Sequence, residues 1–136
     1  MLRCLFPAFF AVLLLFFLTG CVTKRQDSAK LRDLEYVVME KEDVPAELGK
    51  MIAGYKKSPF CLTYADGGNL YLTEGYGEQE KTGYSVSVTE VYETEKEIHI
   101  HTNLMGPKKG EETKEIPTYP YVVVKLEYMD KTVVFD

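Results

Sequence analysis

Hydrophobic and polar residues alternate along much of the chain after residue 60. Val86 and Val88 alternate with serine and threonine, and Ile98 and Ile100 alternate with histidine. A period of two places successive side chains on opposite faces of a strand, so each such run predicts a half-buried β-strand. The strands predicted from alternation, or from β-branched and aromatic composition, cover residues 34–40, 60–65, 70–76, 84–89, 98–102, 121–128 and 132–135.

One segment repeats its apolar residues at helical spacing. Asp43 as an N-cap and Pro45 in the first turn are typical of a helix N-terminus, and Pro59 ends the pattern near residue 57. Between them, apolar residues recur at i, i+3, i+4 and i+7, which predicts a helix with one buried face. That face comprises Leu48, Met51, Ile52 and Tyr55.

These elements favour an α+β chain that is mainly β. Most connections are short, and Gly67 and Gly68 permit a tight turn between two of the strands. Pro120 has no N–H group, so we expect it at a strand start or a sheet edge. The sequence therefore predicts an antiparallel sandwich or curled sheet of about seven strands with one packed helix.

The first twenty residues have the pattern of an export signal. Arg3 precedes an apolar run over residues 5–18, and Leu18, Thr19, Gly20 and Cys21 follow in the order of a bacterial lipobox. The small residues give a signal peptidase access to the bond between Gly20 and Cys21, and the Cys21 thiol accepts a diacylglyceryl group. We therefore expect cleavage after Gly20 and acyl chains, palmitate among them, on Cys21.

This signal divides the chain into three expected parts. Residues 1–20 are the signal peptide, residues 21–33 are the lipidated cysteine and a polar flexible tether, and residues 34–136 are one β-rich domain. Fourteen apolar residues in a helix span about 21 Å, less than the roughly 30 Å hydrocarbon core, although an uncleaved anchor helix is the alternative. Either arrangement places the domain on the extracytoplasmic face of a bacterial cell membrane.

The charge of the exported part restricts its partners. The whole chain carries a formal charge of −5, and removal of Arg3 with the signal leaves −6 on residues 21–136. Nucleic-acid binding requires a basic surface, so we expect no nucleic-acid partner. Adhesion to anionic lipid is equally disfavoured, so the acyl chains must hold the protein on the membrane.

The sequence contains no recognisable catalytic arrangement. It has no nucleophile elbow, no phosphate-binding loop and no zinc-protease helix motif. His99 and His101 share one side of a strand and could supply two metal ligands if Glu97 or another carboxylate joined them. The alternative is a solvated polar face, which we favour. We expect no enzyme activity, cofactor or metal.

Two segments combine an unusual backbone with aromatic side chains. Residues 75–84 hold three glycines and two tyrosines, and residues 116–126 lead through two prolines into the strongest strand. Tyrosines are favoured at protein interfaces. The alternative is that the glycines only shape a turn and the tyrosines cap the core. An exposed edge near the second segment could also pair with a partner strand.

These two segments together resemble the PrcB C-terminal domain family. The order is Gly77-Glu78, then Gly83-Tyr84, then Gly106-Pro107, then the residues Thr-Tyr-Pro-Tyr-Val-Val-Val-Lys-Leu at 118–126. The chain departs from the common Thr-Gly-Gly-Tyr loop by having Thr82 before Gly83. The resemblance covers about residues 60–136.

The resemblance implies a non-enzymatic binding module. The family is similar to small exported lipoproteins, and its name derives from one that associates with and stabilises a surface serine protease. We therefore expect an extracytoplasmic accessory protein whose partner is an exported protein, a protease in particular. The residues expected to bind this partner are Gly77, Thr82, Gly83, Tyr84, Tyr119, Pro120 and Tyr121, with Tyr76 as a further aromatic anchor.

The alternative function is protease inhibition through the same loop. Residues 77–84 have a distant likeness to the Thr-Gly loop that chagasin-type inhibitors insert into cysteine proteases. An inhibitor would lower the turnover of the protease, whereas a stabilising subunit would preserve or raise it.

Overall fold

The computed structural model describes residues 29–136, and the predicted signal, its predicted cleavage site at Gly20 and the predicted lipidation site Cys21 lie outside them. The described part is mainly β with one α-helix, as predicted. In chain order the elements are β1 (Arg32–Asp33), β2 (Val37–Val38), the 3-10 helix η1 (Lys41–Asp43), α1 (Ala46–Tyr55), β3 (Pro59–Asp66), β4 (Asn69–Tyr76), β5 (Ser85–Glu93), β6 (Glu97–Met105), β7 (Tyr121–Glu127) and β8 (Thr132–Phe135).

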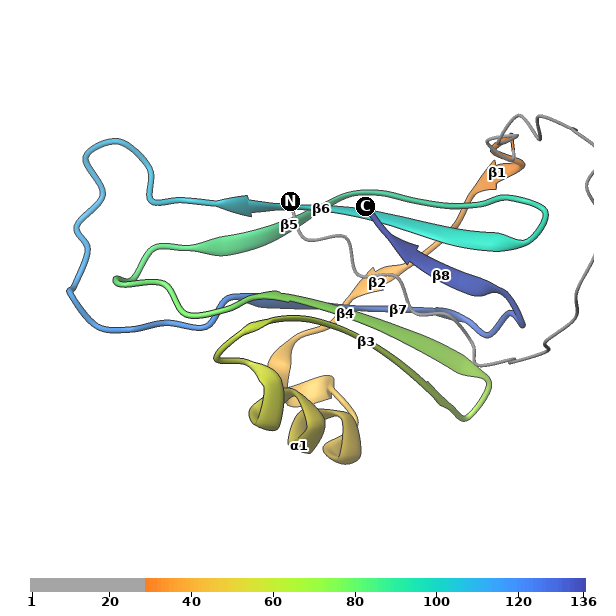
Figure 1. Cartoon of the computed structure of the whole chain (residues 1–136), viewed down its shortest axis with the longest axis horizontal. Coiled ribbons are helices and arrows are strands. Elements are labelled where there is room, and N and C mark those ends of the chain that lie inside the picture. The colour runs from red at the N-terminus through yellow and green to blue at the C-terminus, as the bar shows by residue number, and fades with distance from the viewer. Residues whose placement is uncertain (1–28) are drawn as a thin grey trace, which may run out of the picture.

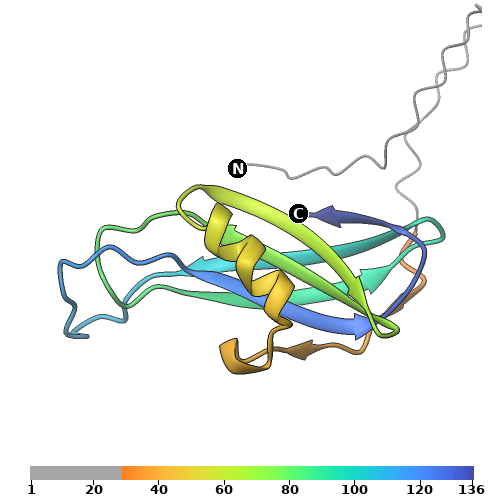
Figure 2. The same cartoon turned by 90° about the horizontal axis from the view of Figure 1, so that it is seen from below.

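The strands form two four-stranded sheets that stack as a sandwich. One sheet has the order β1-β5-β6-β8 and the other β2-β7-β4-β3. Figure 1 shows the two sheets one above the other, with α1 on the outer face of the lower sheet. Figure 2 shows α1 lying across that sheet. The predicted sandwich with one packed helix is therefore confirmed.

Two hydrophobic clusters hold these layers together. The cluster between the sheets has Leu72, Ile100 and Val124 at its centre, each without solvent exposure. The second cluster joins the lower sheet to α1 through Leu48 and Tyr71. Strand β4 contributes to both clusters from its two faces, because successive side chains alternate across the sheet.

Only half of the predicted helix face is buried. Leu48 and Ile52 contact the sheet, whereas Met51 and Tyr55 are exposed. A helix of ten residues on a twisted sheet buries a narrow stripe, so the flanks of a four-residue apolar face remain outside. The predicted Asp43 cap is also wrong: Asp43 ends η1, and the cap position of α1 is Pro45, which makes no side-chain cap.

Only Val37–Val38 of the predicted strand over residues 34–40 is a strand, β2, and a further short strand, β1, precedes it in the other sheet. β1 pairs with β5, β2 pairs with β7, and the chain crosses from one sheet to the other between them. β1 also falls within the last residues of the expected tether. Backbone hydrogen bonds to an existing strand edge, such as Leu31 N–H to the Glu93 carbonyl at 2.8 Å, require no apolar pattern in the sequence.

The closing strand departs from the antiparallel pattern. β8 lies at a sheet edge as predicted, but it runs parallel to β6, with Ile98 opposite Val133. β7 belongs to the other sheet, so the chain crosses between the sheets before it enters β8. β8 is therefore not the second strand of a hairpin, and it need not run antiparallel to its neighbour. The other local predictions are confirmed, because Gly67 and Gly68 have positive φ in the β3–β4 turn and Pro120 directly precedes β7.

No helix among residues 29–136 is long and apolar enough to cross a bilayer.

Candidate partner-binding tip

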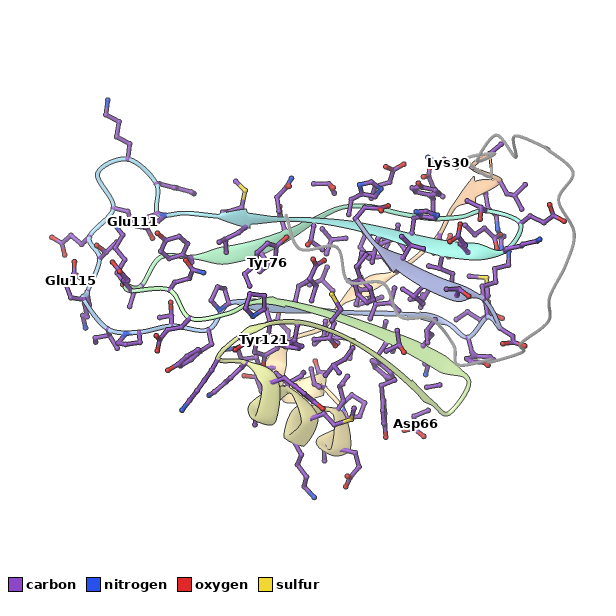
Figure 3. The ribbon with its side chains drawn as sticks, viewed as in Figure 1. Lys30, Asp66, Tyr76, Glu111, Glu115 and Tyr121 are labelled. Atoms are coloured by element: carbon purple, nitrogen blue, oxygen red, sulfur yellow. The ribbon has the colours of Figure 1, made fainter. Side chains whose placement is uncertain are left out.

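The two segments singled out in the sequence meet at one end of the sandwich. We call this end the tip and define it as residues 77–84 and 106–120. Figure 1 shows both connections projecting at the left of the sandwich, and Figure 3 places Glu111 and Glu115 there, opposite Lys30. Segments separated by about thirty residues of sequence therefore form one surface.

Backbone hydrogen bonds join the two segments of the tip. Gln79 and Thr118 form an antiparallel bridge, with N–H to carbonyl distances of 2.8 and 3.0 Å. Thr82 donates its N–H to the Lys114 carbonyl at 3.0 Å, and the Lys114 N–H donates to the Thr82 hydroxyl at 2.9 Å. The Thr118 hydroxyl adds a bond to the Lys81 carbonyl at 2.8 Å. Thr82 therefore stabilises the tip through internal hydrogen bonds of both its backbone and its side chain.

Two glycines that were predicted to bind the partner allow the backbone to pack closely against two prolines at the base of the tip. Gly83 has a φ of 97°, and a Cβ atom there would lie 2.9 Å from the Pro107 ring. Gly77 has a φ of 76°, and a Cβ there would lie 3.0 Å from the backbone nitrogen of Pro59. Both positions require glycine for conformation and for space. Their role in the structure is therefore to shape the tip.

Tyr119 is fixed on the side of the tip that faces the helix. Its hydroxyl donates to the Glu78 carboxylate at 3.1 Å, and the Lys56 ammonium lies 5.0 Å from its ring centroid. The hydrogen bond to Glu78 is the main cause that raises the pKa of Tyr119 above its ordinary value. The neighbouring Pro120 carbonyl accepts a bond from Tyr76 N–H at 3.1 Å.

The remaining tyrosines occupy more enclosed positions. Tyr121 packs against the cluster under α1, and burial raises its pKa. Tyr84 is partly buried beside Gly106. Tyr76 points between the sheets, where its hydroxyl lies 2.6 Å from that of Thr102. The structure thus brings the predicted residues together, with much of their side-chain surface already in internal contacts.

Two exposed apolar side chains in or beside the tip were not among the predicted partner-binding residues, although Ile116 begins the segment singled out in the sequence. Ile116 is 53% exposed in the second segment of the tip, and Met105 is 50% exposed at its start. Ile116 is the one large apolar residue between Lys108 and Tyr119, which was the available signal. Exposed apolar side chains beside a fixed backbone are suited to contact with a protein partner.

A polar chain crosses the sandwich directly behind the tip. Thr102 on β6 donates its hydroxyl proton to the Glu74 carboxylate on β4 at 2.7 Å. Its hydroxyl oxygen can therefore accept the Tyr76 proton at 2.6 Å. Burial raises the pKa of Glu74, and the bond from Thr102 partly opposes that rise. These three residues join the two sheets at the base of the tip.

Glu74→Gln is expected to stabilise the protein at pH 7. The amide can still accept the Thr102 bond and carries no charge to desolvate. Because the folded pKa lies above the ordinary one, the carboxylate costs stability above the folded pKa, and this cost disappears as the pH falls toward the ordinary value. The gain should stay below about 1 kcal/mol, since the group is partly solvated.

Denaturant unfolding of both proteins between pH 4 and pH 8 measures this effect. The difference should be largest at the alkaline end and should shrink on acidification. A difference that is constant across the range would show that ionisation of Glu74 is not its cause.

The two histidines lie outside the tip on the open face of the upper sheet. His99 Nδ1 is 2.9 Å from one carboxylate oxygen of Asp136, and His101 Nε2 is 3.1 Å from the same oxygen without hydrogen-bond geometry. The Tyr92 ring stacks on His99 at 4.8 Å. Across residues 29–136, no cluster of three or more potential ligands is arranged to hold a metal ion.

The arrangement of the tip is suited to binding. Hydrogen bonds join its two backbone segments, its glycines are fixed by packing, and its exposed side chains are apolar or charged. Comparison with protein-family models matches residues 70–127 to the PrcB C-terminal family. This match runs from β4 to the end of β7 and includes both segments of the tip. No curated protein and no solved structure gives a significant match.

Proposed function

Residues 70–127 belong to the PrcB C-terminal family, and on this premise we propose that the chain is an extracytoplasmic accessory protein of an exported protease. It is held on a bacterial cell membrane by lipid on Cys21, and it binds and stabilises the protease through the tip. It acts by binding and not by catalysis.

The observation that carries this proposal is the set of hydrogen bonds that joins the two segments of the tip. The Gln79–Thr118 bridge and the Thr82–Lys114 bonds fix two segments into one surface before any partner arrives. A fixed backbone lowers the entropic cost of binding a protein. The family match supports association with a protease complex, because it includes this same surface.

The exposed side chains suggest where the contact is made. Ile116 and Met105 offer apolar surface, while Thr82 and Gly83 hold the backbone that presents it. Glu111, Glu112 and Glu115 are exposed charged residues of the same segment as Ile116. An apolar centre with a charged rim is the usual composition of a protein interface.

Ile116→Asp is expected to weaken capture of the partner about tenfold or more, because a charge would replace a central apolar contact. The test uses the full chain as bait on detergent-solubilised envelope, with retained proteins identified by mass spectrometry. Met51→Asp is the matched control, since Met51 is 36% exposed on α1, outside the tip.

Loss of an exported protease with Ile116→Asp, and its retention with Met51→Asp, would support the proposal. Equal retention by both variants would remove the tip from the interaction. The activity of the captured protease then separates the two functions. Preserved or raised turnover fits an accessory protein, whereas lowered turnover would assign inhibition through residues 77–84.

A further inference from the structure

The end of the domain opposite the tip carries a concentration of exposed apolar side chains. Val37 is 56% exposed and Tyr128 is 48% exposed, and Leu31, just before β1, is 61% exposed. Val38 is exposed too, but it pairs with the core residue Val124 and so points to the opposite face of the sheet from Val37. Exposed apolar side chains gathered at one end of a domain mark a surface that contacts something else.

A groove of about 950 Å³ connects part of this surface. It is lined by residues 32–37 from the first two strands and their crossover, by Asn69, and by residues 125–129 from β7 and the turn after it. Val37 lies opposite Lys125 in the β2–β7 pairing, which brings its side of β2 next to Tyr128. Figure 3 places Lys30 and Asp66, the neighbours of these segments, at the end away from Glu111 and Glu115.

The charge of this groove is nearly balanced. Arg32 and Lys125 face three carboxylates, Asp33, Glu35 and Glu127. Arg32 is already paired with Glu93. The groove therefore has no basic excess to attract an anionic surface, and its contact must come from apolar and aromatic groups. A tyrosine beside aliphatic side chains is the composition found where proteins meet the headgroup level of a bilayer.

The position of this surface in the chain identifies its partner. Cys21 lies eight residues before Ala29, where the described domain begins, and an extended chain of that length spans at most about 30 Å. With lipid on Cys21, the surface that follows directly in sequence is kept within that distance of the bilayer.

We propose that the domain rests on the bilayer through Val37, Tyr128 and Leu31, and so presents the tip away from the membrane. This proposal rests on the lipid anchor of the proposed function. The contact adds apolar burial to the acyl chains and orients the domain, and it does not depend on anionic lipid.

The chain contains no tryptophan, so single tryptophans report on position without background. Val37→Trp and Tyr128→Trp are compared with Glu112→Trp at the tip, each in the full lipidated chain. The proteins are reconstituted in phosphatidylcholine vesicles whose acyl chains carry bromine, which quenches tryptophan inside or at the edge of the bilayer. Pelleting of the vesicles measures anchoring in the same sample.

The expected result is loss of fluorescence at positions 37 and 128 and none at position 112. If the protein pellets with the vesicles but all three tryptophans are equally bright, the resting surface is wrong and the anchor stands. If the protein stays in the supernatant, both the anchor and the resting surface are wrong. Quenching at position 112 together with brightness at 37 and 128 would reverse the proposed orientation.

Discussion

Leu72→Ala is expected to lower the free energy of unfolding by about 2–5 kcal/mol, the range for a buried leucine truncated in a close-packed core. Leu72 is fully buried between the sheets, opposite Thr63 on one side and Val124 on the other. Its neighbours lie on strands whose backbones are held by hydrogen bonds, so they cannot collapse into the space. The cavity would remain largely open.

Denaturant unfolding followed by circular dichroism in detergent measures this loss. Leu72→Met is the control, because a swap that conserves volume should cost less than about 1.5 kcal/mol. Equal stability of the alanine and methionine variants would mean that the centre of the sandwich relaxes freely. The close packing described between the sheets would then be wrong.

Gly75→Ala is expected to lower the free energy of unfolding by about 1–3 kcal/mol, the usual cost of overpacking, or somewhat more. A Cβ atom at this position would lie 2.1 Å from the Phe60 ring, which is buried under α1. Gly75 pairs with Phe60 on β3 and with Tyr121 on β7, so the backbone has little freedom to move away. The ring would have to turn into its neighbours.

The same substitution in the helix serves as a matched control. Gly49 lies in the middle of α1, and a Cβ there would have nothing within 4 Å. Gly49→Ala should therefore raise the free energy of unfolding by about 0.5–1 kcal/mol, since alanine loses less backbone entropy than glycine in a helix. Two Gly→Ala changes of opposite sign would confirm that the Phe60 ring decides the cost at position 75. Loss at both positions would contradict this.

The longer strands could be predicted from the sequence because their periodicity is strong. β6 and β7 bury alternate residues on the face between the sheets, as the runs around Ile98 and Val122 indicate. β1 was not predicted and β2 was predicted too long, because a strand of two residues has no measurable period. The parallel direction of β8 depends on which sheet the chain enters after β7, and local sequence does not contain that information.

The position of the candidate site was accessible for a different reason. Residues 77–84 and 117–121 stand out by glycine, proline and tyrosine content, and the family resemblance joins them. Their internal hydrogen bonds were not predictable, because the Thr82–Lys114 pairing is set by tertiary contacts. For the same reason Ile116 was not among the predicted partner-binding residues, because its exposure is a property of the folded loop and not of its residue type.

The hydrogen bonds within the tip have a thermodynamic consequence for the binding of any partner. A loop that becomes ordered only on binding loses about 1–2 kcal/mol of backbone entropy for each residue it fixes. Because the Gln79–Thr118 bridge orders this part of the tip during folding, that entropy is lost before a partner binds. Association should then resemble the docking of two rigid bodies, with a heat-capacity change set by the buried apolar area and no added contribution from loop folding.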